Sequence, residues 1–479
     1  MAACGLWMLV AVALAMVATG LPAWIALLGV SIAFALGGIA AGAFDANLLG
    51  AVSPRLVGLL ENDLLQALPL YVFMGVMINR TALAGTLFRA ARAALAPTGR
   101  GVSLAGLFLG VLLAPMSGSA GASVAMLSKT LYPRLAGVGM PEDRNVALVC
   151  VSSTLGVVVP PSLVLILLGD AMMRAHTEAS HFAPVAGRIV NTQDVFYAAL
   201  VPAGLFIAAC IAIAAWRGRE APGAAPEPCS RSDWITALLA TALIVGLLAG
   251  VALGYLYAVE AAATGGMALL AHGLATRALR RDVLAAVLRE TLALTGALFA
   301  LLLAATVFTL VQRAFGTDRW LAAAFAGMGG GPLSILARGL AAIAACALVL
   351  DAFEMIFVVV PLVAPALLLR VSDAPWVAVL MLLILQASFL VPPFGYAVMM
   401  ARSRTGTRVP TGALALALAP YVAAQLVVLA LVLSFPGLLW RGGEAEAAAT
   451  ATPANAAEML ERQLEGNEAP AKGNEAPGK

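Results

Sequence analysis

Two double prolines, Pro160-Pro161 and Pro392-Pro393, interrupt long apolar runs of this sequence. Proline has no backbone N–H, so a double proline breaks a helix and leaves carbonyl oxygens one turn upstream without a donor. Free carbonyl oxygens are suitable ligands for a dehydrated cation such as Na⁺ when nearby side chains supply further oxygens. Each break is therefore a candidate ion site, and we expect the prolines to set its geometry.

Small and oxygen-bearing residues lie close to both breaks. Hydroxyl and amide oxygens can complete an oxygen cage, and glycines let two backbones approach one another closely. A simpler interpretation is that such residues are packing and kink residues of an ordinary helix bundle. Because the breaks occur in matched pairs, we expect these residues to line ion and substrate sites: Ser153, Thr154, Gly156, Gln386, Ser388 and Gly395.

The apolar region 101–135 is interrupted in its middle by Ser117, Gly118 and Ser119. Each half is marginal in length for a membrane crossing, so a re-entrant hairpin is an alternative to two crossings. Polar, irregular backbone at membrane depth is tolerated only where it is buried in protein or lines a watery cavity. We therefore expect the three tip residues to line a site, where a half-helix N-terminus could hold a carboxylate.

The apolar region 331–370 is interrupted by two acidic residues, Asp351 and Glu354. Ionisable side chains inside a membrane are costly and are candidates for function. Their spacing places both on one face of a helix, where they could ligate Na⁺, carry a proton or cap the second half of a hairpin. Asp351 as a helix N-cap is the structural alternative, whereas we expect that a cap does not require Glu354.

The composition defines the class of protein that holds these residues. The chain has 479 residues, of which 62% are apolar and 11% are charged, and its mean hydropathy is +0.97. A soluble domain carries about 25% charged residues, so the composition excludes a soluble enzyme and a nucleic-acid-binding protein and indicates a protein of the lipid bilayer. The five cysteines form no CxxC pair and the three histidines have no metal-site grouping, so we expect no cofactor.

A helix needs about 20 apolar residues to cross the membrane core. Arginine clusters follow the third, fifth, seventh and ninth candidate spans and fall on one side if the N-terminus is outside. The mixed-charge segment 170–194 is then expected to be an external loop, and the tail 441–479 to be disordered. We predict an all-α polytopic membrane protein with about ten crossings and two hairpins, the candidate spans being 5–19, 21–42, 64–79, 144–168, 195–216, 234–252, 255–275, 291–312, 375–401 and 411–436.

The same order of features occurs twice along the chain. Ser117 precedes Pro160 by 43 residues, and Asp351 precedes Pro392 by 41. An odd number of crossings separates the starts of the two copies, so they run in opposite directions, as in secondary transporters whose site lies between inverted repeats. The predicted divisions are scaffold helices 1–63, a first inverted repeat 64–170 with hairpin 101–135 and broken helix 144–168, linking helices 171–290, a second inverted repeat 291–401 with hairpin 331–370 and broken helix 375–401, and a last scaffold helix 402–440.

Four motifs give this sequence a resemblance to a known family. They are PMSGSA at 115–120, STLGVVVPPS at 153–162, LDAFEM at 350–355 and QASFLVPPFG at 386–395. Through them the sequence resembles, over residues 5–436, the large membrane subunit of the tripartite ATP-independent periplasmic (TRAP) transporters. The Phe353-Glu354 tip and the Leu-Leu-Gly-Asp run after the first double proline are similar to the branch labelled for mannitol or chloroaromatic compounds.

The resemblance implies an elevator mechanism, in which the hairpins and broken helices slide as one body within a scaffold. It implies Na⁺-coupled import of a small organic acid across a bacterial inner membrane. It also implies two partners, a small four-helix membrane subunit and a soluble periplasmic substrate-binding protein. With the resemblance and the oxygen-rich breaks together, we expect Na⁺ at Ser117, Ser119, Thr154, Asp351 and Gln386.

Two other classes of protein compete with this prediction. A standalone symporter of the same inverted-repeat design is one, and neighbouring genes for a four-span protein and a binding protein would argue against it. A channel or a membrane enzyme is the other. Residues 118–121 have a superficial likeness to an intramembrane serine protease motif, but no histidine lies in a plausible partner span. We therefore predict a transporter and not an enzyme.

Overall fold

The computed structural model describes residues 3–61, 63–117, 119–182, 190–218, 228–327, 329–348 and 350–440. Within these ranges the chain is built from helices and contains no strand, which confirms the predicted all-α class. The tail 441–479, predicted to be disordered, lies outside the described residues, and so does Gly118 of the first hairpin tip.

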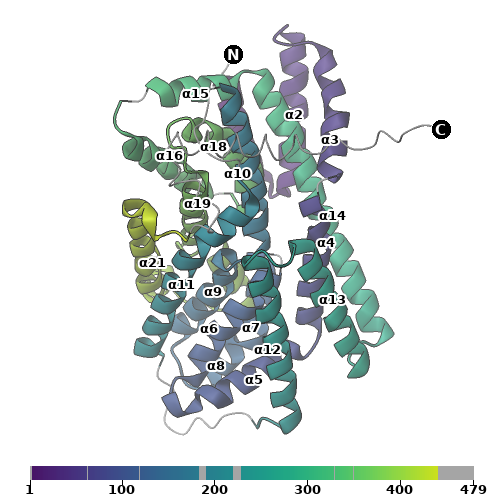
Figure 1. Ribbon diagram of the computed structural model, residues 1–479, viewed down its shortest axis with the longest axis vertical. Coiled ribbons are helices and arrows are strands. Elements are labelled where there is room, and N and C mark those ends of the chain that lie inside the picture. The colour runs from purple at the N-terminus through teal and green to yellow at the C-terminus, as the bar shows by residue number, and fades with distance from the viewer. Residues whose placement is uncertain are drawn as a thin grey trace, which may run out of the picture. The chain divides into compact units, whose positions relative to one another are not determined.

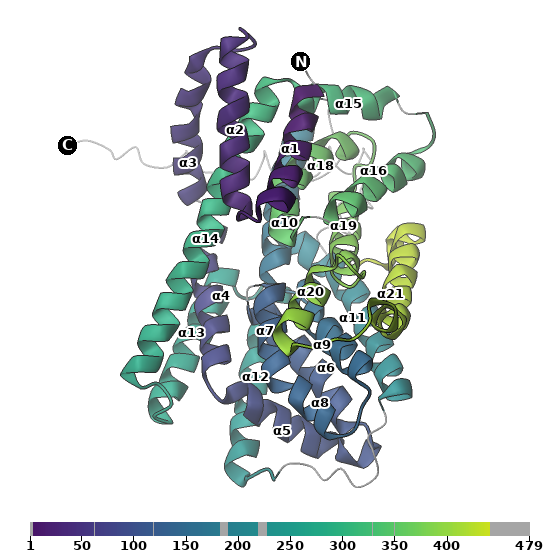
Figure 2. The ribbon, with the colours of Figure 1, turned by 180° about the vertical axis from the view of Figure 1, so that it is seen from behind.

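The helices outside the hairpins and broken helices pack mainly against one another. α14 runs along α2 and α4, and α13 runs along α4 (Figure 1 and Figure 2). Leu238 and Leu239 of α12 are largely exposed, as expected for side chains that face lipid. These helices are α1 (Ala3–Thr19), α2 (Ala23–Ala40), η1 (Ala46–Ala51), α3 (Val52–Leu60), α4 (Asp63–Arg80), α12 (Arg231–Ala252), α13 (Ala258–Ala275) and α14 (Arg281–Ala314).

Five of the described helices are long and apolar enough to cross a membrane. They are α2, α12, α14, α11 (Thr192–Arg217) and α21 (Thr411–Ser434). Two bent pairs also pass, α3 with α4 and α9 (Glu142–Val158) with α10 (Leu163–Phe182), which raises the number to seven. The predicted spans 5–19 and 375–401 contain shorter apolar helices, and α13 in the predicted span 255–275 does not pass. The membrane class therefore holds, while the count of ten crossings stays a prediction.

The first half of the chain contains a turn between two short helices and a helix that is interrupted at the first double proline. The hairpin tip lies between α6 and α7, and α9 ends just before the double proline, where the chain bends by 41° into α10. The helices of this repeat, besides α4, α9 and α10, are α5 (Leu83–Leu95), η2 (Ala96–Thr98), α6 (Gly101–Leu113), η3 (Pro115–Ser117), α7 (Ala120–Thr130) and α8 (Tyr132–Gly137).

The expected external loop at 170–194 is wrong over its first half. The helix α10 continues through this polar segment to Phe182. Asp170 and Arg174, one turn apart, form an ion pair of 3.0 Å along the helix, and such pairs support a helix whose apolar stretch has ended. The three charged residues Asp170, Arg174 and Glu178 therefore lie on a helix and not on a loop.

The second repeat has the same plan. Its hairpin tip precedes a short helical start, a π-helical turn and then a further helix, and its broken helix is interrupted at the second double proline. Both Pro-Pro bonds, Pro160-Pro161 and Pro392-Pro393, are cis. The helices, besides α14, are α15 (Thr317–Gly327), α16 (Pro332–Ala347), α17 (Ala352–Glu354), η4 (Met355–Val359), α18 (Val360–Leu368), α19 (Ala374–Phe389) and α20 (Tyr396–Thr405).

The two repeats pack in a similar way, and two contacts of each hairpin have equivalents in the other repeat. Within each repeat, the first hairpin helix packs on the first half of the broken helix, α6 on α9 and α16 on α19. Between the repeats, the second hairpin helix packs on the other repeat's second half-helix, α7 on α20 and α18 on α10. In both views the hairpin α6–α7 lies toward one end of the bundle and the hairpin α16–α18 toward the other (Figure 1 and Figure 2). The two hairpins therefore lie toward opposite ends of the bundle, where two inverted copies would place them.

The helix that follows each broken helix packs on the broken helix of the other repeat. α11 packs on α19, α21 packs on α9, and α11 and α21 pack on each other. The core lies at the broken helices, because α9 from Asn145 onward and nearly all of α19 are buried. The chain then ends its described part in the short turn η5 (Pro436–Leu438).

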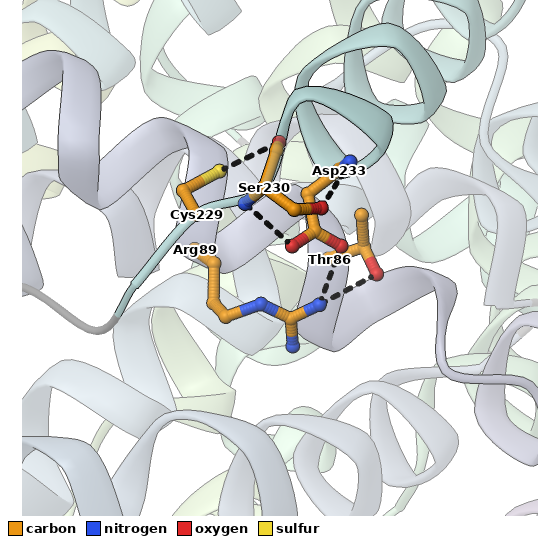
Figure 3. A network of polar contacts seen from close by, with 5 residues as sticks. All are labelled: Thr86, Arg89, Cys229, Ser230 and Asp233. Carbon is orange, nitrogen blue, oxygen red and sulfur yellow. Dashed lines mark hydrogen bonds and ion pairs between the residues drawn. The ribbon is translucent and has the colours of Figure 1, made fainter.

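A polar clamp fixes the connector of the first repeat to the linking helices (Figure 3). Arg89 of α5 donates hydrogen bonds to Asp233 (2.8 Å) and to Thr86 (3.1 Å). Asp233 and Ser230 form a reciprocal capping box at the start of α12, which satisfies two of the backbone donors that a helix N-terminus leaves free. The clamp joins α5 to α12 and thereby positions the helix that leads into the first hairpin.

Candidate functional site

The first break is organised by a serine that the predicted site did not include. The Ser162 hydroxyl donates to the Val157 carbonyl at 2.8 Å and accepts from the Leu165 N–H at 3.1 Å. It therefore bridges the end of α9 and the start of α10 across the double proline. The signal was present in the sequence, since a serine three residues before a helical N–H is a common N-cap.

Two predicted hydroxyls lie buried on α9 just before this break. Ser153 donates to the Cys150 carbonyl at 2.8 Å, and Thr154 donates to the Val151 carbonyl at 3.0 Å. Each hydroxyl has one donor and two acceptor sites. The bonds to their own helix use the protons, so oxygen lone pairs of both side chains stay available to a cation.

The tip of the first hairpin faces this break. Ser119 caps α7 by accepting from the Ala122 N–H at 3.1 Å, and it borders a cavity of about 10 Å³ together with Ser153 and Ser162. A cavity of this size has room for about one water molecule or small ion. The structure thus brings Ser119, predicted from the hairpin, to Ser153, predicted from the broken helix; Gly118 and the Ser117 side chain lie outside the described residues.

Gly156 is what lets the hairpin approach so closely. A Cβ added there would lie 2.3 Å from the Ala114 carbonyl carbon and 2.6 Å from the Pro115 nitrogen. Both atoms belong to the hairpin backbone, which cannot rotate away as a side-chain end can. Gly156 therefore sets the distance between hairpin and break, and its part in an ion or substrate site stays a prediction.

The residues around the second break resemble those around the first but include fewer hydroxyl groups. Ser388 donates to the Leu385 carbonyl at 2.7 Å, on its own helix. A Cβ on Gly395 would lie 2.5 Å from the Phe389 carbonyl oxygen, so the chain folds tightly back across the double proline Pro392-Pro393. The predicted residues of this break thus shape the backbone at the point where α19 ends.

The two broken helices meet through residues that occupy equivalent positions in the two repeats. The Gln386 amide donates to the Thr154 carbonyl at 3.3 Å across 232 residues of chain, and Pro160 and Pro392 are separated by the same 232 residues. The Gln386 carbonyl oxygen accepts from the Gln425 amide at 3.0 Å, and that amide also donates to the Leu383 carbonyl. All three side chains are buried. Gln425, on α21, did not appear in the prediction, because nothing local in the sequence connects it to the breaks.

Asp351 and Glu354 form a reciprocal capping box at the tip of the second hairpin. The Asp351 carboxylate accepts from the Ala352 N–H at 2.5 Å, and the Glu354 carboxylate accepts from the Asp351 N–H at 3.0 Å. The cap expected as the alternative for Asp351 is therefore present, and the expectation that a cap does not require Glu354 is wrong. A carboxylate has about four acceptor sites, so one cap bond on each leaves capacity for a cation.

Tyr396 stands between the two hairpins and was also missed. It begins α20, and its ring packs on Phe389 with centroids 6.2 Å apart. A Cβ added to Gly121 of the first hairpin would lie 2.7 Å from the Tyr396 hydroxyl oxygen, and Asp351 and Glu354 of the second hairpin are among the charged groups in its surroundings. A tyrosine directly after a Pro-Pro-Phe-Gly turn gives no distinctive sequence signal, so only the packing reveals this position.

Comparison with known proteins supplies the family. Residues 10–438 match the family described as "Tripartite ATP-independent periplasmic transporter, DctM component". The chain is 25% identical over 407 residues to the C4-dicarboxylate TRAP transporter large permease protein DctM of Pseudomonas aeruginosa, which covers 82% of this chain and 90% of that protein. It is 24% identical over 404 residues to the sialic acid TRAP transporter permease protein SiaT of Haemophilus influenzae, covering 82% of this chain and 62% of that one.

Two further similarities are more limited. The match to the DctM permease of Rhodobacter capsulatus is 27% identical over 220 residues and spans 45% of this chain and only 49% of that protein. The crystal structure of the Alcanivorax borkumensis YdaH transporter aligns with a TM-score of 0.56 at 18% identity, covering 83% of this chain and 88% of that one. That alignment supports the fold alone. The predicted branch for mannitol or chloroaromatic compounds stays a prediction.

Proposed function

Because this chain belongs to the family of DctM components of tripartite ATP-independent periplasmic transporters, we propose that it is the large permease of such a transporter. The family consists of transporter components and not of enzymes. In this proposal the chain lies in the bacterial inner membrane and imports a small organic acid together with Na⁺. Relatives named for C4-dicarboxylates and for sialic acid support the substrate class, because both kinds of compound carry a carboxylate.

One observation carries the transport proposal: the inverted repeats exchange partners and meet at their breaks. α7 packs on α20 as α18 packs on α10, and Gln386 bonds Thr154 where the two breaks cross. Repeats related in this way can adopt two arrangements in which their roles are exchanged, which is the basis of alternating access. The four half-helices and both hairpins form one contiguous core, which supports their movement as the body of an elevator.

The proposed Na⁺ sites follow from the oxygens at the breaks. The cavity beside Ser119 and Ser153 is small, and four serines form part of its otherwise largely apolar wall, so hydroxyl oxygens are within reach of one dehydrated cation. Thr154 and Gln386 supply oxygens where the broken helices cross, and Asp351 supplies a carboxylate at the second hairpin tip. The carboxylate of the substrate would bind near the N-termini of the half-helices, whose dipoles favour an anion.

Two protein partners belong to the proposal because the family is tripartite by description. A small four-helix membrane subunit would cover part of the lipid-facing surface of the linking helices. A soluble periplasmic binding protein would deliver the organic acid and would select it. A standalone symporter, which needs neither partner, is the competing proposal.

Transport into proteoliposomes tests the proposal. We would reconstitute the chain with its small subunit and measure uptake of radiolabelled succinate and sialic acid, with and without binding protein and with and without an inward Na⁺ gradient. Uptake that needs both the binding protein and Na⁺ is expected. Uptake without a binding protein would support the standalone symporter, and uptake driven by a pH gradient alone would refute Na⁺ coupling.

A matched pair of variants ties Na⁺ to the break. Ser153→Ala removes a buried hydroxyl that bonds its own helix beside the cavity, whereas Ser31→Ala removes a buried hydroxyl that bonds the Leu27 carbonyl at 2.6 Å on α2. Ser153→Ala should raise the Na⁺ concentration that gives half-maximal uptake by about tenfold, a loss typical of one good ligand. Ser31→Ala should leave it unchanged, and equal effects in both would show that the serines contribute only packing.

A further inference from the structure

A cavity of about 710 Å³ lies between α10, α14, α3 and the second hairpin. Its volume is within the range of sites that bind small organic molecules, roughly 300 to 1,000 Å³. Much of the wall is apolar and includes Leu59 of α3, Leu302 of α14 and Phe357 of η4. The lining includes residues of the second hairpin but neither the residues of the two breaks nor the acidic pair Asp351 and Glu354.

Three arginines and two carboxylates from different elements line this cavity. Arg313 of α14 forms an ion pair with Glu178 of α10, and Arg174 pairs with Asp170 along α10 at 3.0 Å. The side chains of the two acids are 17% and 9% exposed, whereas those of Arg313 and Arg174 are 36% and 53% exposed. The acids therefore lie deeper in the wall, and the arginines present their charge to the open space.

Arg55 of α3 is the third arginine, and within the described residues it forms no ion pair or hydrogen bond. Its charge is close enough to Arg313 to be repelled by it and close enough to Glu178 to be attracted. Among the residues that line the cavity, three arginines outnumber two carboxylates by one charge, and a third carboxylate, Asp318, lies close to Glu178 outside the lining. Two like charges, Arg55 and Arg313, thus face one cavity, an arrangement that an anion between them would stabilise.

We propose that this cavity is a second binding site for an organic carboxylate, held between Arg55 and Arg313. The inference rests on the proposed transport of organic acids and adds a second position at which the transported acid binds. Guanidinium groups bind carboxylates by two parallel hydrogen bonds, and the apolar wall at Leu59 and Phe357 accepts the carbon skeleton. The carboxylate competes with Glu178 for Arg313.

The position of the site gives it a role in passage. Arg55 and Arg313 belong to α3 and α14, which pack with the helices outside the broken core, whereas Glu178 and Phe357 belong to the repeats' own half-helix and hairpin. An anion bound here contacts both groups of helices. By replacing Glu178 as the partner of Arg313, it releases the ion pair that joins α10 to α14.

Cysteine labelling tests the site without reference to transport. Thr177→Cys places a thiol on the exposed face of α10 at the cavity, in a chain whose partly exposed Cys4, Cys229 and Cys346 are replaced by serine. The probes are an anionic reagent, sulfonatoethyl methanethiosulfonate, and its cationic trimethylammonioethyl counterpart. The anionic reagent should label the introduced thiol faster than the cationic one. Arg55→Ala should lower the ratio of the two labelling rates about fivefold, and succinate should slow labelling by the anionic reagent.

The control is Arg338→Ala, which removes an equal charge from an exposed position on α16 outside the cavity. It should leave the ratio and the succinate protection unchanged. An equal effect of Arg338→Ala and Arg55→Ala, or protection by phosphatidylglycerol and not by succinate, would overturn the proposal, the latter in favour of a lipid site.

Transport kinetics separate this inference from the proposed function. Arg55→Ala should raise the KM for uptake about fivefold, because it removes one of the two guanidinium groups that hold the carboxylate. An unchanged KM in a chain that transports would overturn the second site and leave the permease function intact. Labelling that behaves as expected in a chain that transports no acid would instead refute the proposed function while supporting an anion site.

Discussion

The substitution Gly156→Ala isolates the contact between the first hairpin and the first break. The added Cβ would lie 2.3 Å from the Ala114 carbonyl carbon and 2.4 Å from the Ala114 Cβ. Ordinary carbon contacts need about 3.5 Å, so the hairpin must retreat by about 1 Å. The cavity beside Ser119 and Ser153 is only about 10 Å³, and a shift of this size would pull the Ser119 oxygen out of reach of a bound cation.

The size of the effect follows from this displacement. Overpacking of a buried contact costs about 1 to 3 kcal/mol of stability, part of which is returned because alanine favours a helix over glycine by about 1 kcal/mol. The protein should therefore still fold, with a small fall in the thermal midpoint. A 1 Å misplacement of a site can cost about 100-fold in activity. Na⁺-driven uptake should therefore fall strongly, while the thermal midpoint falls only slightly.

The assay is Na⁺-dependent uptake into proteoliposomes, with the thermal midpoint measured on the same preparations. Gly204→Ala on α11 is the matched control, because a Cβ there meets no atom within 4 Å. It should keep wild-type uptake and gain slightly in stability. Gly156→Ala with wild-type Na⁺ dependence would refute the conclusion that this glycine sets the cation site.

Three further predictions concern single polar groups. Ser162→Ala removes the cap that joins α9 to α10 and should lower the free energy of unfolding by about 1 kcal/mol. The thermal midpoint should therefore fall, and an unchanged midpoint would exclude a capping role. Gln386→Leu leaves the buried Gln425 amide with one partner fewer and should lower the free energy of unfolding by about 1 to 3 kcal/mol. The double variant with Gln425→Leu should lose less stability than the sum of the two single variants. Strict additivity would show that the two amides act independently. Asp351→Asn keeps an N-cap oxygen and should express normally but weaken Na⁺ dependence, whereas loss of expression would show that its charge is needed for folding.

The local chemistry of the sequence determined where the helices break. A double proline removes two consecutive N–H donors, and α9 and α19 each end shortly before one, whereas single prolines lie inside α11 and α21. The capping box of Asp351 and Glu354 is equally local, because it needs only residues three positions apart, but only the cap by Asp351 is expected from the sequence. For this reason the positions at which the helices break could be predicted from the sequence, whereas the roles of Gly156, Thr154 and Gln386 at an ion or substrate site stay predictions.

The tertiary structure decided which of these local features meet. The bond from Gln386 to Thr154 joins residues far apart in sequence, and Gln425 and Tyr396 enter the core only through the packing of α21 and α20. The cavity with Arg55 and Arg313 takes its charges from helices that no periodicity connects. A sequence pattern reports forces between neighbours along the chain, whereas these contacts depend on the exchange of partners between two inverted repeats, which exists only once the helices have packed.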